Sequence, residues 1–209
     1  YWAWDSSIDT INGEILYEDE AGAVGSISAG TNVLYGCQRL VPTMDGQLTQ
    51  IQFNNAGNNF TWTANIYDNK SGANLSGPMT SQMSGSNEPY GGILTVDLPS
   101  PVSVYAGNDI YVAVRMHNPT STYHPCDTDG PVSGEAFYSV TSISSGYTVN
   151  TLGDWGIHAI VIPNGPTATP APPTATPTPG IQTPSTGPMG IGVLLLVIGG
   201  LLTGLKRRK

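Results

Sequence analysis

Residues 109–117 read DIYVAVRMH, and the character of their side chains alternates along the chain. Every second residue is large and aliphatic: Ile110, Val112, Val114 and Met116. The residues between them are aromatic, small or charged. Because successive side chains of an extended chain point to opposite faces, a period of two predicts a β-strand with one buried face.

The same alternation recurs through residues 1–163. It predicts two further long strands, over 59–67 (NFTWTANIY) and 155–162 (WGIHAIVI). Shorter strands are expected at 33–35, 38–41, 48–53, 93–98, 102–105 and 136–140. Turn-forming runs such as NNAGNN and AGND separate them, and no long stretch has a helical period. The sequence therefore predicts an all-β domain, an antiparallel β-sandwich or jelly roll.

Eight apolar residues are predicted to fill the space between the two sheets. They are Phe53, Trp62, Ile66, Val96, Val112, Val114, Trp155 and Ile157. A domain of this length can bury a core of that kind without further support.

The charge of the chain is distributed unevenly. Only 11% of the residues are charged, and the formal net charge is −8. The 15 acidic residues lie between Asp5 and Asp154, where Arg39, Lys70 and Arg115 are the basic ones. Nucleic acid is excluded as a partner, because phosphate binding needs clustered Lys and Arg.

Residues 164–187 are rich in Pro and Thr, as in PTATPAPPTATPTPG. This segment has almost no large apolar side chain, so it cannot bury enough surface to offset the entropy lost on ordering. We expect a disordered, extended linker.

Residues 188–209 have the pattern of a membrane anchor. The stretch MGIGVLLLVIGGLLTGL (189–205) carries no charge and is followed by Lys206, Arg207, Arg208 and Lys209. A transmembrane helix is expected here, with the basic tail in the cytoplasm and the globular domain outside. The membrane is thus a predicted partner. No secretory leader is visible from Tyr1 onward, so we expect a signal peptide or a longer upstream part.

The segment QTPSTG (182–187) resembles the sorting signal of sortase-anchored bacterial surface proteins. Pro184, Thr186 and Gly187 match that signal, while Thr183 stands where the signal has Leu. The resemblance implies a sortase-type enzyme as a processing partner. Cleavage after Thr186 and a retained anchor both remain open, and either gives a membrane- or wall-anchored protein at the cell surface.

Cys37 and Cys126 are the two cysteines of the chain. Outside the cell an even number of cysteines favours a disulfide, so we predict a bridge between them. The alternative is a pair of buried free thiols.

The run YHPCDTDG places Asp127 and Asp129 two residues apart beside a glycine. Hard carboxylate oxygens in such a turn suit Ca²⁺, whose loops use Asp-x-Asp in the same way. A turn stabilised by an Asp side chain, without metal, is the alternative. No GxSxG motif or nucleotide-binding motif is present, so we expect no catalytic residues and no enzyme.

Several longer runs look like a known type of module. They are IYDNKSG, LTVDLPSPVSVYAGNDIYVAV, DTDGPVSGEAFYSV and GDWGIHAIVIP, within residues 16–163. They resemble the non-catalytic β-sandwich modules of secreted bacterial peptidases and surface proteins, similar to gingipain-type accessory domains. In CQRLVP, Leu40 replaces the aromatic residue of that pattern. The resemblance implies a jelly-roll-like fold, an extracytoplasmic location and no chemistry of its own.

The leading hypothesis is a surface-anchored β-sandwich module for interaction, adhesion or structural display, with a glycan or a protein as ligand. One alternative is a carbohydrate-binding module, with or without stabilising calcium. It is favoured by the 10 Tyr and 4 Trp residues, because exposed aromatic rings beside Asn and Asp stack on sugars. The other alternative is the C-terminal remnant of a larger secreted hydrolase.

Overall fold

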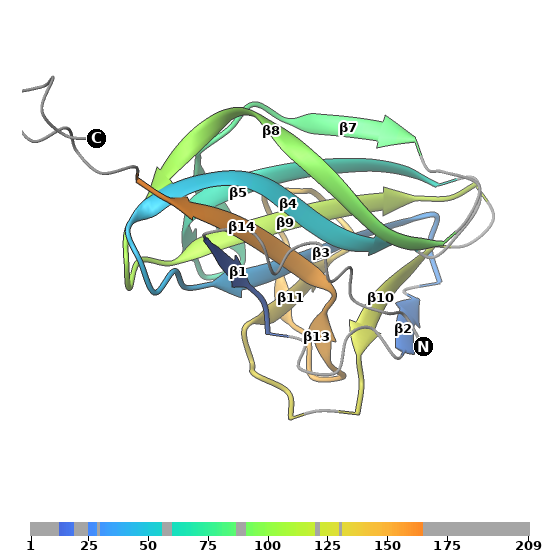
Figure 1. Ribbon diagram of the computed structural model, residues 1–209. Helices are drawn as coiled ribbons and strands as arrows, with labels where there is room; N and C mark the ends of the chain where they lie inside the picture. Colours follow the sequence, from blue (N-terminus) through green and yellow to red (C-terminus); the bar gives the residue numbers. More distant parts are fainter. Residues whose placement is uncertain are drawn as a thin grey trace, which may run out of the picture. The chain divides into compact units, whose positions relative to one another are not determined.

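The computed structural model describes residues 13–18, 25–28, 30–55, 60–86, 91–119, 122–129 and 131–164 (Figure 1). These residues form fourteen β-strands and no helix. Every strand pairing is antiparallel. The predicted all-β, antiparallel character of the domain is confirmed.

The first sheet has four strands in the order β1-β14-β4-β8. Their bounds are Glu14–Leu16 for β1, Ile157–Pro163 for β14, Gly46–Asn55 for β4 and Gly92–Val104 for β8. The shortest of them, β1, lies at one edge and pairs through Leu16 with Ala159. The chain thus leaves the described domain from β14, in the interior of this sheet.

The second sheet has seven strands. Six follow the order β12-β11-β3-β9-β5-β6, and β7 also pairs with β5. Their bounds are Thr148–Val149 (β12), Ala136–Ser139 (β11), Val33–Leu40 (β3), Ile110–His117 (β9), Thr61–Ser71 (β5), Asn74–Pro78 (β6) and Met83–Ser86 (β7). A small third sheet joins β13 (Asp154–Trp155), β10 (Tyr123–Asp127) and β2 (Gly25–Ser28).

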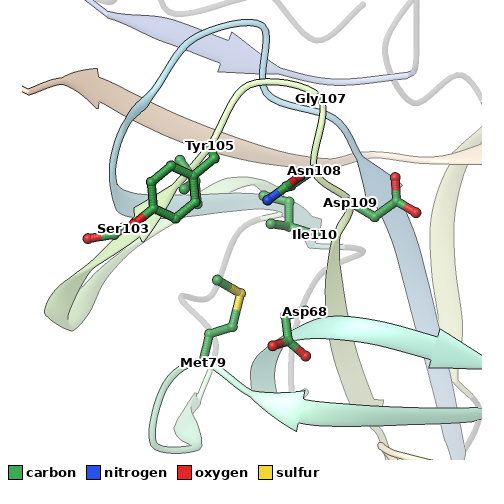
Figure 2. Close-up of a pocket in the computed structure, with 9 residues that line it drawn as sticks. Asp68, Met79, Ser103, Tyr105, Gly107, Asn108, Asp109 and Ile110 are labelled. Atoms are coloured by element: carbon green, nitrogen blue, oxygen red, sulfur yellow. The ribbon is translucent and has the colours of Figure 1, made fainter.

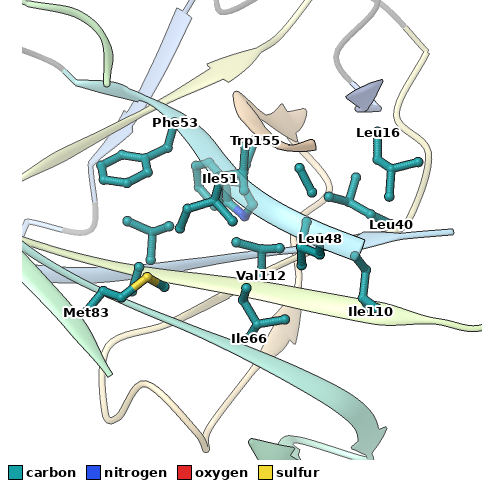
Figure 3. Packing of buried hydrophobic residues seen from close by; sticks show 14 of the residues in the cluster. Leu16, Leu40, Leu48, Ile51, Phe53, Ile66, Met83, Ile110, Val112 and Trp155 are labelled. Carbon is teal, nitrogen blue, oxygen red and sulfur yellow. The ribbon is translucent and has the colours of Figure 1, made fainter. Parts of the chain in front are cut away.

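The two larger sheets share one hydrophobic core (Figure 3). Phe53 of β4 meets Trp62 of β5 edge to face, with ring centroids 5.4 Å apart. Ile51 from the first sheet and Val112 from the second belong to the same buried cluster. Apolar side chains of both sheets therefore face each other, as the strand periodicity predicted.

Seven of the eight residues predicted for this core are buried. Val96 is the exception, since it is only partly buried and packs against the margin of the cluster. It belongs to β8, which lies at the edge of its sheet and is covered less completely than β4 or β9.

Strand β8 bends in its middle. Gln50 of β4 pairs with Asp97, but Leu48 pairs with Val102, so residues 98–101 (LPSP) form a bulge opposite Thr49. Within the described residues, β8 pairs with β4 alone. Its free edge includes Pro99 and Pro101, which have no N–H to offer to another strand.

The predicted disulfide is wrong, because Cys37 and Cys126 are free thiols in the structure. Cys37 of β3 packs on the outer face of the second sheet, in a small cluster with Tyr111 and Phe137. Cys126 of β10 belongs instead to the main core between the sheets. Burial raises the pKa of both thiols, that of Cys126 to about 11, so neither is a reactive thiolate at neutral pH.

The predicted linker, sorting motif and membrane anchor lie outside the described residues, apart from Asn164. This covers Pro184, Thr186, Gly187 and the basic residues 206–209. In the part of the chain that the structure describes, no helix has the length and apolarity needed to cross a membrane.

Candidate functional site

A hollow of about 540 Å³ opens at the turn between β8 and β9 (Figure 2). It is lined by Asp68, Met79, Ser103, Val104, Tyr105, Gly107, Asn108, Asp109 and Ile110. Figure 2 shows Tyr105 and Asn108 on the turn, across the hollow from Met79 and Asp68. Residues far apart in the sequence therefore form its two sides.

Tyr105 is the exposed aromatic residue of this hollow, with 57% of its surface accessible. The turn that carries it is fixed from outside. The N–H of Ala106 donates to Asp45 Oδ1 at 2.9 Å, and the N–H of Gly107 donates to the Pro42 carbonyl at 2.8 Å. The ring is therefore presented to solvent on a braced loop, which keeps the entropy cost of binding low.

Two polar side chains at the hollow are not committed to other described residues. Neither the amide of Asn108 nor the carboxylate of Asp68 makes a hydrogen bond within the described part of the chain. Asp68 lies directly against Gly77, whose φ is +65° and where a Cβ would fall 1.7 Å from Asp68 Oδ1. Glycine suits this backbone conformation, and its lack of a Cβ lets the Asp68 carboxylate lie close to the backbone of β6.

Asp109 has a structural task instead. Arg39 of β3 donates to Asp109 Oδ1 at 2.7 Å and to Glu135 Oε1 at 2.5 Å. The hydroxyl of Tyr111 donates to Asp109 Oδ2 at 3.2 Å. The Arg39 contact lowers the pKa of Asp109, and burial with the nearby carboxylate raises the pKa of Tyr111 to about 12. This network ties β3, β9 and residue 135 together behind the hollow.

The predicted calcium residues lie elsewhere. Asp127, at the end of β10, is buried, and its Oδ1 accepts the N–H of Asp129 at 3.1 Å. This contact is that of a turn stabilised by an Asp side chain, and the hydrogen bond with Asp127 raises the pKa of Asp129. Among the described residues no three His, Cys, Asp or Glu side chains converge to hold a metal. The calcium site stays a prediction.

The sequence marked aromatic residues as candidates but did not separate exposed rings from buried ones. Tyr67, Tyr111 and Tyr147 are buried, whereas Tyr105 and Tyr123 are exposed. The adjacent run AGND was the available signal for Tyr105, because it predicts a turn at the end of a strand. The approach of Asp68 and Met79 from another hairpin had no local signal.

Comparisons with known proteins agree with this architecture. No curated protein matches the chain. Two solved structures of Cwp84 resemble it at 15% and 16% identity, with TM-scores of 0.58 and 0.55. One is a clostridial cysteine protease after propeptide cleavage; the other contains the cysteine protease and lectin-like domains of a surface layer associated protein of Clostridium difficile. Each match covers 73% of this chain but only 41% and 36% of the other.

A family model gives the more specific result. The model described as "Lectin like domain" matches residues 15–156, which is more than half of the chain. The matched region includes the hollow beside Tyr105 and both large sheets up to the last strand. The chain therefore belongs to the lectin-like domain family.

Proposed function

We propose that this protein is a non-catalytic carbohydrate-binding module of a bacterial cell surface, and that it binds neutral sugar residues in the hollow beside Tyr105. The observation that carries the proposal is an exposed, braced tyrosine beside Asn108 on one side of an open hollow, with Asp68 on the other side; within the described residues neither polar side chain is hydrogen-bonded. Membership of the lectin-like domain family supports it. Among the hypotheses drawn from the sequence, the hollow and the family membership favour the carbohydrate-binding module.

The chemistry of the hollow suits a pyranose ring. One face of such a ring presents C–H groups, which pack against an aromatic ring, while hydroxyls at its rim form hydrogen bonds. Tyr105 offers the aromatic face, and Asn108 offers both a donor and an acceptor. Asp68 accepts hydrogen bonds from hydroxyls and repels anionic ligands, so a neutral sugar is favoured at this site.

The surface location is part of the proposal. The structurally similar protein Cwp84 is a surface layer associated protein, which supports a location at the cell surface for this chain. Anchoring through the apolar segment and basic tail, with or without sortase processing, is proposed on the sequence pattern alone. The relative also carries a cysteine protease domain, which favours a role beside a catalytic domain as the second candidate.

The test is a glycan array probed with the full chain, followed by titration of the strongest neutral glycan. Tyr105→Ala should weaken binding about tenfold or more, because burial of an aromatic ring contributes about 1.5–3 kcal/mol. Asp68→Asn should weaken it less, since the amide still accepts one hydrogen bond. The matched control is Tyr138→Ala on β11, an exposed tyrosine outside the hollow. Silence across neutral glycans, or equal losses from both tyrosine variants, would contradict the proposal.

A further inference from the structure

A second hollow, of about 360 Å³, lies on the outer face of the seven-stranded sheet. Its floor is a row of three residues from neighbouring strands. Arg115 of β9 pairs with Tyr35 of β3 on one side and with Thr63 of β5 on the other. Paired residues of adjacent strands share one face, so an aromatic ring, a guanidinium and a hydroxyl lie side by side.

One wall of this second hollow is the loop after β11, which contributes Thr141, Ser142 and Ile143. The loop is held by several hydrogen bonds. Ser139 Oγ donates to the Ser145 carbonyl at 2.8 Å and accepts the N–H of Thr141 at 3.0 Å. The buried Tyr147 donates its hydroxyl to the Ile143 carbonyl at 3.0 Å. The wall is therefore a braced structure that presents hydroxyl groups beside Arg115.

Arg115 differs from the other two basic residues of the acidic domain. Arg39 is engaged with Asp109 and Glu135. Lys70 donates to the Gly72 carbonyl at 2.7 Å and lies 4.0 Å from the centre of the Phe137 ring. Within the described residues Arg115 forms no ion pair, although it is half-buried in a hollow. Its fork of N–H donors matches the two oxygens of a carboxylate.

We propose that this second hollow binds the carboxylate of an acidic sugar, such as a uronic or sialic acid residue. Arg115 takes the carboxylate, the ring of Tyr35 packs on the sugar, and Thr63 and the loop hydroxyls bond its hydroxyl groups. The choice of a sugar as carrier of the carboxylate rests on the proposed function. The anion preference does not, because it follows from Arg115 and its surroundings.

The two hollows are separate sites. Ile110 lines the first and Arg115 the second, and they lie near opposite ends of β9. Five residues of extended strand span roughly 17 Å. The sites also differ in charge, because the first has Asp68, which repels anions, and the second has Arg115, which attracts them.

The test is a titration of the full chain with methyl glucuronide, methyl glucoside and acetate. Binding is measured by NMR chemical shifts or by calorimetry. Methyl glucuronide should bind at least tenfold more tightly than either of the others. Arg115→Gln should remove the tenfold advantage over methyl glucoside, which is equivalent to about 1.4 kcal/mol. Lys70→Gln, which removes the same charge elsewhere on the sheet, is the control and should leave binding of the glucuronide unchanged.

The outcomes separate this inference from the proposed function. Loss of glucuronide binding in Arg115→Gln but not in Tyr105→Ala supports a distinct acidic-sugar site. Equal binding of acetate and glucuronide overturns the assignment of a sugar, and equal losses in Arg115→Gln and Lys70→Gln overturn the site. Methyl glucuronide that fails to bind while neutral glycans still bind overturns this inference alone.

Discussion

A buried histidine should make the domain sensitive to mild acid. His124 of β10 is fully buried, and its ring lies 4.6 Å from that of Trp155. Among the described residues neither ring nitrogen has a partner in good hydrogen-bond geometry, although the backbone of Val114 and Pro125 lies near the ring and offsets part of the cost of burial. Burial lowers the pKa of His124 from 6.5 to about 4, because a charged imidazolium cannot be solvated there.

The sign and size of the effect follow from proton linkage. As the pH falls below about 6.5 the unfolded chain binds a proton at His124 and the folded chain does not, so the free energy of unfolding decreases. The decrease continues until about pH 4, where the folded form also becomes protonated. The gap between the two pKa values corresponds to about 3 kcal/mol, at about 1.36 kcal/mol per pH unit.

The substitution His124→Phe tests this reasoning, because it keeps a ring beside Trp155 and removes the titration. We expect wild type to lose about 3 kcal/mol more stability than the variant between pH 7 and pH 4. Urea unfolding followed by tryptophan fluorescence at both pH values gives the comparison. His124→Gln serves as a second non-titrating variant if Phe packs poorly. If both variants lose as much stability in acid as wild type, His124 is not the cause of the acid sensitivity.

Two further predictions concern the same region and the cysteines. Gly36→Ala should lower the free energy of unfolding by about 1–3 kcal/mol, because the new Cβ would fall 2.6 Å from His124 Nε2 in a filled core. Thermal unfolding measures this loss, and an unchanged Tm would contradict the prediction. Cys37 and Cys126 should resist iodoacetamide in the native protein and both react in urea without reductant, since both thiols are free and buried; a mass two hydrogens lower before reduction would show a disulfide instead.

The long strands could be predicted because their hydrophobic period is strong. Two pairs of predicted short strands, 33–35 with 38–41 and 93–98 with 102–105, are each one continuous strand. Gly36 and the LPSP run interrupted the apolar pattern without ending the strand. Hydrogen bonding to neighbouring strands, which a local pattern does not contain, keeps them extended.

Short polar strands gave no such signal. β2 reads GSIS, β6 reads NLSGP and β7 reads MSGS, so a turn was as good an interpretation of each. They are strands because a longer neighbouring strand provides hydrogen-bond partners for their backbones, as β5 does for β6 and β7. The disulfide was wrongly predicted for the same reason, since a local pattern contains no information on distant contacts. The sequence did not show that Cys37 faces away from the main core.

The candidate sites depended on contacts across the fold. Tyr105 and its turn were visible from the sequence, but Asp68 reaches the hollow from about 40 residues earlier in the chain. The alternation in DIYVAVRMH placed Arg115 on the face opposite Val112 and Val114, and Arg115 does lie beside Tyr35 and Thr63 on the outer face. The braced loop that turns this face into a hollow comes from residues 141–143, whose serine-rich sequence indicates only a turn.

The bent edge strand β8 bears on how the protein behaves when many copies are crowded together. A straight, exposed edge invites another chain to add a strand, which is a common route to aggregation. Pro99 and Pro101 withhold the donors that such an addition needs, and the bulge turns the edge away from the plane of the sheet. Neighbouring copies packed densely side by side would then find it hard to join their sheets through this edge.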